Sequence, residues 1–286
     1  MTKLLSYVCP LCGQEHSKST ERCSETQEEV PKEFRLDGWT IDAKYRLDRK
    51  VGYGGMGIVY EGTHLTIGRK IAVKFLSTSI KTNEKIIVRF QNEAKMAASI
   101  GHRNIVDVID MGVFQDDLYY IVMEYLYGQD LATMLQYRRR LPGKEAVDYT
   151  IQVLDGLRAA HAKGIIHRDL KPENIFIVSQ LGGVKYVKIL DFGVSRLIDS
   201  ETGDNPNRTI PGTVFGTPRY MSPEQARGRA SVDHRSDIYS VGAMLYEMLC
   251  GSPLYTAEAS NEVIAEVLTT EPPHILKRNP HVQFEL

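Results

Sequence analysis

The residues of this 286-residue chain that are best suited to chemistry lie in two short segments near its middle. The first reads HRDLKPEN and the second reads DFG. In the first, Asp169 can accept the proton of an attacking hydroxyl, and Lys171 can offset the charge of a migrating phosphoryl group. Asn174 and Asp191 supply oxygen atoms of the kind that Mg²⁺ prefers as ligands. Together these groups are the ones that phosphoryl transfer requires.

Binding the phosphates of a nucleotide requires further groups, and a glycine-rich segment upstream reads VGYGGMGIVY. Its last residues are β-branched and aromatic, which predicts a strand, so the glycines join two strands. A dinucleotide-binding loop would instead open a helix. Backbone N–H groups of such a hairpin can cover phosphates, and glycine permits the close approach. The residues predicted to serve here are Val51, Gly52, Gly54, Gly55, Gly57 and Val59.

A lysine stands inside the apolar segment IAVKF, which is predicted to be a strand. Burying Lys74 there is costly unless a partner neutralises it. Residues 84–100 have the apolar spacing of a helix, and Glu93 lies on it. A glutamate of this helix is a candidate partner for Lys74; Glu84 also lies on it, at the helix start, where an acidic residue suits the helix dipole.

These segments resemble the signature set of the protein kinase family, which also includes a Pro-Glu end to the activation segment, here SPE at 222–224. Chance explains one such motif easily but not five in the family's order. The GGMG and SPEQA runs are similar to those of bacterial eukaryotic-like Ser/Thr kinases, and Lys171 fits the Ser/Thr pattern. The resemblance implies an α+β, two-lobed fold, with an antiparallel N-lobe sheet, one main N-lobe helix and a mostly helical C-lobe.

The resemblance also assigns roles. ATP and Mg²⁺ (or Mn²⁺) would be the cofactors, and Ser/Thr residues of proteins the acceptors. Asp237 matches an aspartate that holds the catalytic-loop backbone. The catalytic set would be Asp169, Lys171, Lys74, Glu93 and Thr217, with Asn174 and Asp191 as Mg²⁺ ligands. The resemblance selects Glu93, rather than Glu84, as the glutamate that pairs with Lys74. The adenine pocket would include Val59, Ala72, Met123, Glu124, Leu126 and Phe176.

The polar stretch between DFG and Thr217 has the composition of a loop. Thr209 and Thr213 are candidate phosphorylation sites, and they are otherwise ordinary polar loop residues. A phosphate there could pair with Arg168 and order the segment. We therefore expect autophosphorylation, with self-association for transfer in trans.

The N-terminal sequence CPLCG has the form of a zinc knuckle, in which two thiolates converge on one metal. Cys9 and Cys12 would need two further ligands, and Cys23 and His16 are the candidates nearby. The alternative is a degenerate tail without metal.

The predicted boundaries are a zinc-ribbon-like segment with linker at 1–30, a linker at 31–44, and a kinase domain at 45–286. The domain would divide into an N-lobe at 45–125 and an incomplete C-lobe at 126–286. The C-lobe is predicted to be truncated, because the final helices and the arginine that would pair with Glu224 are missing. We therefore expect a fragment of a longer protein.

Composition narrows the alternatives. The chain has 35 basic and 36 acidic residues, so its net charge is −1. That charge provides no positive field to attract nucleic acid or an anionic membrane. There is neither an apolar run of 18 residues nor a signal peptide, so a cytoplasmic location is the default expectation. An ATP-binding pseudokinase or scaffold remains an alternative, as truncation favours it. A small-molecule kinase is disfavoured by the intact peptide-docking segment 216–224.

Overall fold

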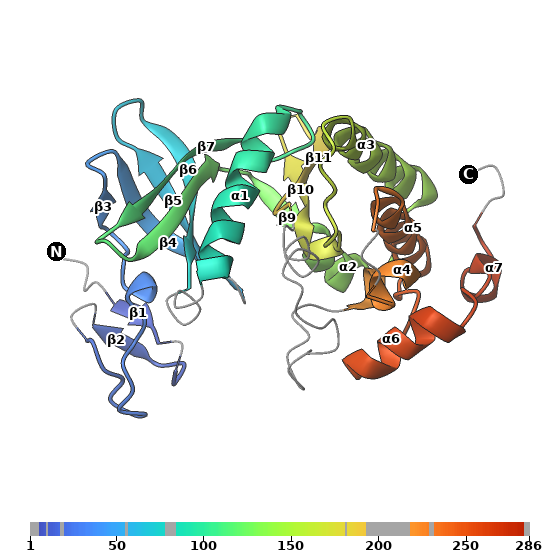
Figure 1. Cartoon of the computed structure of the whole chain (residues 1–286), viewed down its shortest axis with the longest axis horizontal. Helices are drawn as coiled ribbons and strands as arrows, with labels where there is room; N and C mark the ends of the chain where they lie inside the picture. The colour runs from blue at the N-terminus through green and yellow to red at the C-terminus, as the bar shows by residue number, and fades with distance from the viewer. Residues whose placement is uncertain are drawn as a thin grey trace. The chain divides into compact units, whose positions relative to one another are not determined.

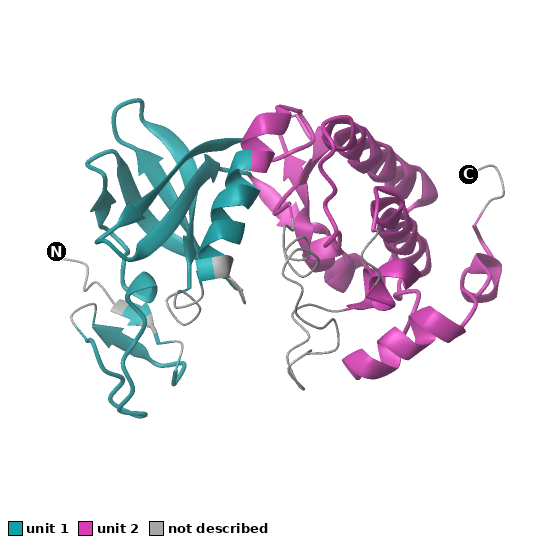
Figure 2. Ribbon diagram, in the orientation of Figure 1, with its two compact units in different colours: residues 1–95, 107–126 teal, residues 96–106, 127–286 magenta. Residues whose placement is uncertain are grey.

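The computed structural model describes residues 6–9, 11–17, 20–54, 57–77, 84–180, 182–192, 218–228 and 232–282. The chain forms two compact units (Figure 2). Unit 1 comprises Met1–Lys95 and Asp107–Leu126, and unit 2 comprises Met96–Val106 and Tyr127–Leu286.

Unit 1 is built on a six-stranded antiparallel sheet in the order β3-β4-β5-β6-β8-β7 (Figure 1). Its strands are β3 (Thr40–Ile41), β4 (Tyr45–Gly54), β5 (Gly57–His64), β6 (Arg69–Leu76), β7 (Val108–Phe114) and β8 (Leu118–Glu124). Helix α1 (Glu84–Ile100) lies against one face, where Phe90 and Ala94 pack on Leu76 and Ile121.

The two faces of this sheet differ in burial. Val59 pairs with Lys74, and Ala72 pairs with Met123, so these four residues share the face on which α1 packs. The opposite face is closed by fully buried side chains, among them Tyr60, Ile71, Val73, Phe75 and Val122. The face that carries Lys74 can therefore take part in polar interactions, whereas the opposite face forms part of the hydrophobic core.

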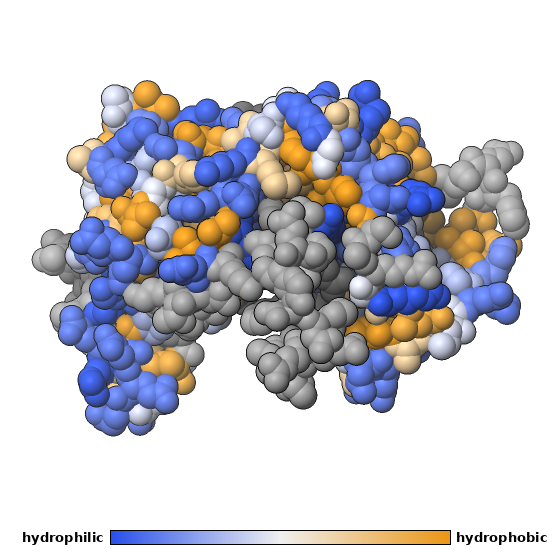
Figure 3. Space-filling model, in the orientation of Figure 1, coloured by the Kyte–Doolittle hydropathy of each residue, from blue (hydrophilic) through white to orange (hydrophobic). Residues whose placement is uncertain are grey.

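The N-terminal segment contributes to that core. It contains the hairpin β1 (Ser6–Val8) and β2 (Glu15–Ser17) and the short helix η1 (Lys32–Phe34). A single hydrophobic cluster joins Val30, Phe34 and Leu36 to the buried face of the sheet. Where the sequence predicts a linker over 31–44, the structure therefore places η1, β3 and core side chains. Figure 3 shows a largely hydrophilic surface over the β1–β2 region.

Unit 2 is mostly helical and carries a small antiparallel sheet in the order β11-β10-β9. Its helices are α2 (Leu131–Arg138), α3 (Gly143–His161), α4 (Pro223–Ala226), α5 (Arg235–Cys250), α6 (Ser260–Thr269) and α7 (Ile275–Arg278). Its strands are β9 (Gly128–Asp130), β10 (Ile175–Ser179) and β11 (Lys185–Ile189), and short helices η2 (Pro172–Asn174) and η4 (Pro218–Tyr220) complete it.

Helix α5 forms the centre of unit 2, with α3 packed against it. Its buried positions include Val241, Met244 and Met248, whose spacing follows one face of a helix. The helix ends at Gly251, whose left-handed φ of 76° suits a glycine C-cap. Within the described residues, none of the helices combines the length and apolar character that crossing a bilayer would require.

Candidate active site

The predicted partner of Lys74 lies close to it in unit 1. The Nζ atom of Lys74 on β6 is 3.8 Å from Oε1 of Glu93 on α1. Their side chains are only 8% and 13% exposed, so Glu93 supplies the counter-charge that an ammonium in this packed position requires. A paired, nearly buried ammonium of this kind is suited to bind phosphate oxygens.

The glycine-rich segment forms the hairpin of β4 and β5, with Gly52 opposite Val59 and Gly54 opposite Gly57. Gly57 has a steric reason to be glycine, because a Cβ there would lie 1.8 Å from the backbone oxygen of Phe75. The hairpin therefore lies directly against the strand that carries Lys74. Val51 is 42% exposed on β4.

The end of β8 is fastened to the residue before β7. The backbone N–H of Glu124 donates to the oxygen of Asp107 over 3.0 Å. In return, the N–H of Asp107 donates to the Glu124 carboxylate over 2.8 Å. Met123, Glu124 and Leu126 are half-buried, and Leu126 is the last residue of unit 1.

In unit 2, the catalytic candidates lie on the segment between α3 and η2. The Nζ atom of Lys171 is 2.9 Å from Oδ2 of Asp169. The side-chain NH₂ of Asn174 donates to the backbone oxygen of Asp169 over 2.8 Å. Because that bond uses the nitrogen end of the amide, its oxygen is the end that can serve as a Mg²⁺ ligand.

His167 anchors this segment in the core. The side chain is fully buried, and its Nδ1 accepts the backbone N–H of Asp169 over 3.3 Å. Nε2 is then the protonated nitrogen and donates to the oxygen of Leu190 over 2.9 Å. Its ring also packs on Phe192, with the centroids 4.9 Å apart. The histidine thus ties Asp169 to the residues around Asp191.

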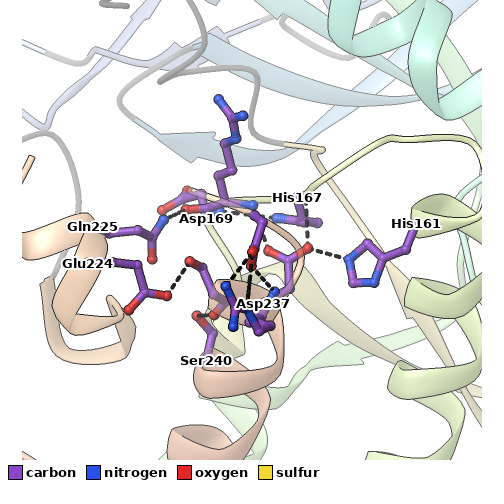
Figure 4. Close-up of polar contacts among 11 residues, drawn as sticks. His161, His167, Asp169, Glu224, Gln225, Asp237 and Ser240 are labelled. Carbon is purple, nitrogen blue, oxygen red and sulfur yellow. Dashed lines mark hydrogen bonds and ion pairs between the residues drawn. The ribbon is translucent and has the colours of Figure 1, made fainter. Parts of the chain in front are cut away.

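Asp237, at the start of α5, holds the same segment from below (Figure 4). Its carboxylate accepts the backbone N–H groups of His167 and Arg168 over 2.9 and 2.8 Å. His161 on α3 lies 2.7 Å away through Nε2. Burial would raise the pKa of Asp237, but the hydrogen bond from His161 and these N–H donors outweigh burial and keep that pKa below its usual value.

Two residues of the site have unusual backbone angles. Arg168 has a φ of 64° and Asp191 a φ of 42°, in a region that non-glycine residues seldom occupy. The backbone of Arg168 is fixed on both sides, because its oxygen also accepts from the Gln225 side chain over 2.8 Å. Such held conformations gather at functional sites.

Arg168 also carries an unmatched donor. Within the described part of the chain, its Nε is buried without a hydrogen-bond partner. Burial lowers the pKa of the guanidinium because it removes water from the cation. A neighbouring negatively charged group would offset that cost, so the position favours pairing with an anion.

The end of the activation segment is attached to α5. The Ser236 hydroxyl donates to the Glu224 carboxylate over 2.6 Å, and Ser240 donates to the oxygen of Tyr220 over 2.7 Å. Burial would raise the pKa of Glu224, and the bond from Ser236 holds it below its usual value. This carboxylate, for which the sequence predicts a missing arginine, therefore has a hydroxyl donor.

The structure does not describe every residue that the sequence predicts for the site. Gly55, Thr217, Thr209 and Thr213 lie outside the described residues. Phe176 is described: it lies on β10, between Asp130 and Lys188, and is half-buried.

Sequence reasoning missed two residues that position the catalytic segment, His161 and Gln225. A histidine six residues before His167, at the end of an amphipathic helix, was the available signal for the first. For Gln225 the signal was the capping box that it forms with Ser222. Neither pattern indicates which distant group the side chain contacts, the Asp237 carboxylate for His161 and the Arg168 backbone oxygen for Gln225.

The N-terminal cysteines lie together in unit 1. Ligand atoms of Cys9, Cys12, His16 and Cys23 all lie within 4.8 Å of one another, and the cysteines are free thiols. The first three come from the β1–β2 hairpin, where Cys12 Sγ is 3.3 Å from His16 Nε2. A tetrahedral Zn²⁺ would hold such atoms about 3.8 Å apart, so this cluster could hold a metal ion.

Cys23 comes from a second turn, in which Arg22 pairs with Glu29. The Thr26 hydroxyl and its backbone N–H both donate to the sulfur of Cys23 and lower its pKa to about 6. The thiolate is the form that binds metal, so this turn favours a ligand.

Comparison with known proteins agrees with this arrangement. Residues 45–284 match the protein kinase domain family. The chain is 42% identical over 247 residues to the serine/threonine-protein kinase pkn3 of Myxococcus xanthus, covering 86% of this chain and 45% of that protein. It is 36% identical over 247 residues to PrkC of Bacillus subtilis, covering 86% and 36%. The chain thus spans less than half the length of these relatives.

Among solved structures, a double mutant of the Mycobacterium tuberculosis PknI kinase domain aligns with a TM-score of 0.65 at 27% identity. The alignment covers 86% of this chain and 85% of that one. The predicted fold class, an antiparallel sheet with one main helix followed by a mostly helical part, is confirmed. The chain belongs to the protein kinase family and groups with its bacterial serine/threonine members.

Proposed function

We propose that this chain transfers the γ-phosphate of ATP to serine and threonine hydroxyls of proteins. The observation that carries the proposal is the arrangement of the catalytic segment. There the carboxylate of Asp169 lies 2.9 Å from the Nζ atom of Lys171, and the side-chain NH₂ of Asn174 donates a hydrogen bond to the backbone oxygen of Asp169. An exposed base beside a cation suits proton removal from a hydroxyl that attacks a charged phosphoryl group. The side chain of Asp169 is 40% exposed, so an acceptor hydroxyl can reach it.

Each group then has a defined role. Lys74, held by Glu93, would bind phosphate oxygens, and Asp169 would accept the hydroxyl proton. Asn174 and Asp191 would hold Mg²⁺, which when bound with ATP offsets the charge of the phosphates. Lys171 would stabilise the negative charge that develops during transfer.

Incubation with Mg²⁺ and γ-labelled ATP, with a generic Ser/Thr protein substrate, tests the proposal. We expect label on serine or threonine in the wild type, and loss of label in Lys74→Met. Nucleotide binding without any transfer would instead support the pseudokinase alternative.

We also expect autophosphorylation within residues 199–217. Arg168 supports this, because its half-buried guanidinium, with a buried Nε that has no hydrogen-bond partner among the described residues, is suited to a phosphate on Thr209 or Thr213. Mass spectrometry of protein incubated with MgATP should find phosphate there, and less of it in Thr209→Ala or Thr213→Ala. Full activity with no phosphate anywhere in this stretch would contradict the prediction.

For the N-terminal cluster, we propose that the bound ion is Zn²⁺. Three thiolates and one imidazole are a ligand set that zinc favours, and a site with four protein ligands is structural. Metal analysis of purified protein should find about one zinc per chain, as expected for a closed four-ligand site. Cys9→Ser should lose it, while Cys250→Ser, at the end of α5, should retain it. Zinc well below one per chain in the wild type would rule the site out.

A further inference from the structure

The segment that follows the metal cluster lies against the glycine-rich hairpin. Immediately after the Cys23 turn, the N–H of Val30 donates to the oxygen of Glu21 over 2.8 Å, which closes that turn. The chain then enters η1. The cysteine cluster and the hairpin strands are thus separated by only one short connection.

Aromatic contacts join η1 to β4. The ring of Phe34 is 4% exposed, and its centroid lies 4.9 Å from that of Tyr53, next to Gly54 at the tip of the hairpin. The Nζ atom of Lys50 on the same strand lies 4.9 Å from the Phe34 ring centroid. Tyr53 is itself 66% exposed, so this contact between two rings tilted by 60° restrains a side chain that otherwise faces solvent.

Hydrogen bonds join the same segment to both strands. The hydroxyl of Tyr60 on β5 donates to the oxygen of Glu33 over 2.8 Å and accepts the N–H of Leu36 over 3.4 Å. The N–H of Lys50 donates to the Asp37 carboxylate over 3.2 Å. Residues 33–37 therefore hold the two strands of the hairpin from the buried face of the sheet.

The segment also reaches β6. Glu33 is fully buried, and its carboxylate accepts the hydroxyl of Ser77 over 3.3 Å, three residues after Lys74. One short segment thus contacts β4, β5 and the residue that directly follows β6, and these three strands carry the predicted phosphate-binding residues of unit 1.

The cysteine cluster contributes to the support of this segment. A hairpin of two three-residue strands does not persist alone in water, and here Cys9 and Cys23 form part of the core together with Phe34. A metal that binds all four ligands would close both turns and fix their shared core. Without it, the residues that brace β4 and β5 lose the part of their support that the cluster provides.

We infer that metal binding at Cys9, Cys12, His16 and Cys23 sets the position of the glycine-rich hairpin through Phe34, and so tunes nucleotide affinity. The inference rests on the proposed zinc site and ATP-binding function, and adds regulation of the nucleotide site by metal occupancy. As a consequence, loss of the metal from the thiols changes the affinity for ATP although no ATP-binding residue is altered.

The test measures the Kd for MgATP with the full chain, before and after a zinc-selective chelator in excess Mg²⁺. In the wild type, we expect zinc removal to raise the Kd roughly fivefold or more, the lower end of coupling between two sites. Cys250→Ser, a thiol variant outside the cluster, should respond as the wild type does. An unchanged Kd in chelated, zinc-free and still folded wild-type protein would overturn the inference.

Phe34→Leu then identifies the route, since it keeps an apolar core side chain but removes the ring that contacts Tyr53 and Lys50. This variant should keep its zinc, start with the raised Kd, and show no further rise on chelation, because two changes along one route are not additive. A full chelation effect in Phe34→Leu would exclude Phe34 as the connection. Circular dichroism confirms that each sample is folded.

The outcomes separate the inference from the proposals beneath it. Zinc-dependent nucleotide affinity without phosphotransfer would disprove the kinase activity alone. Phosphotransfer together with a Kd for MgATP that does not change on zinc removal would disprove only the coupling between the metal site and the nucleotide site. A wild-type protein that binds no zinc would remove both the metal site and the inference.

Discussion

Asp169→Asn should lower phosphotransfer by about 10²–10⁴-fold, the usual contribution of a general base. Asparagine has the same size and can still accept a hydrogen bond from Lys171, which lies 2.9 Å from the carboxylate in the wild type. It cannot take up the proton of an acceptor hydroxyl, however. The loss should therefore appear in the rate of transfer, while the Kd for MgATP changes little. Initial rates of label transfer and nucleotide titrations on the same samples measure the two effects.

Asp155→Asn is the matched control, because it makes the same chemical change on the exposed surface of α3. It should transfer label at the wild-type rate. Should Asp169→Asn retain activity within tenfold of the wild type, the assignment of Asp169 as the base would be wrong. A loss of nucleotide binding in that variant would point to a structural role instead.

Asp237→Ala should destabilise unit 2 by roughly 2–6 kcal/mol, because it leaves two buried backbone N–H groups without their acceptor, at about 1–3 kcal/mol each. Those N–H groups belong to His167 and Arg168, so the catalytic segment would also lose the support that holds Arg168 in its unusual conformation. Against the 5–15 kcal/mol that stabilises a typical domain, this is a large loss. Urea unfolding followed by circular dichroism measures it, and label transfer should fall in parallel.

Asp155→Ala again provides the comparison, since its carboxylate pairs with Arg158 on the surface. It should unfold at a urea concentration close to that of the wild type. Equal midpoints for Asp237→Ala and Asp155→Ala would show that the buried carboxylate is not needed to hold the segment.

The catalytic part of this molecule was predictable because its residues lie close together in the sequence. Asp169, Lys171 and Asn174 fall within six positions, so a local turn is enough to gather them. The pair of Lys74 and Glu93 was predictable for a different reason. A lysine in an apolar strand requires a counter-charge, and the resemblance to protein kinases selected Glu93 rather than Glu84 on the next helix.

The contacts between distant segments were not predictable in the same way. His161 and Gln225 hold the catalytic segment from α3 and α4, and nothing in their local sequence states what they bind. The segment around Phe34 reads as polar and unpatterned, with single apolar residues separated by charges. Its role becomes visible only when the buried face of the sheet is known, because that face needs apolar cover.

The shared core of the N-terminal segment and the sheet also bears on how unit 1 loses its structure. The family match begins at residue 45, yet Val30, Phe34 and Leu36 belong to the same hydrophobic cluster as the strands that follow. Regions that share one core tend to open together as a cooperative unit. The start of the family match and the boundary of the cooperative unit are therefore expected to differ, because residues before position 45 fill the interior of the sheet.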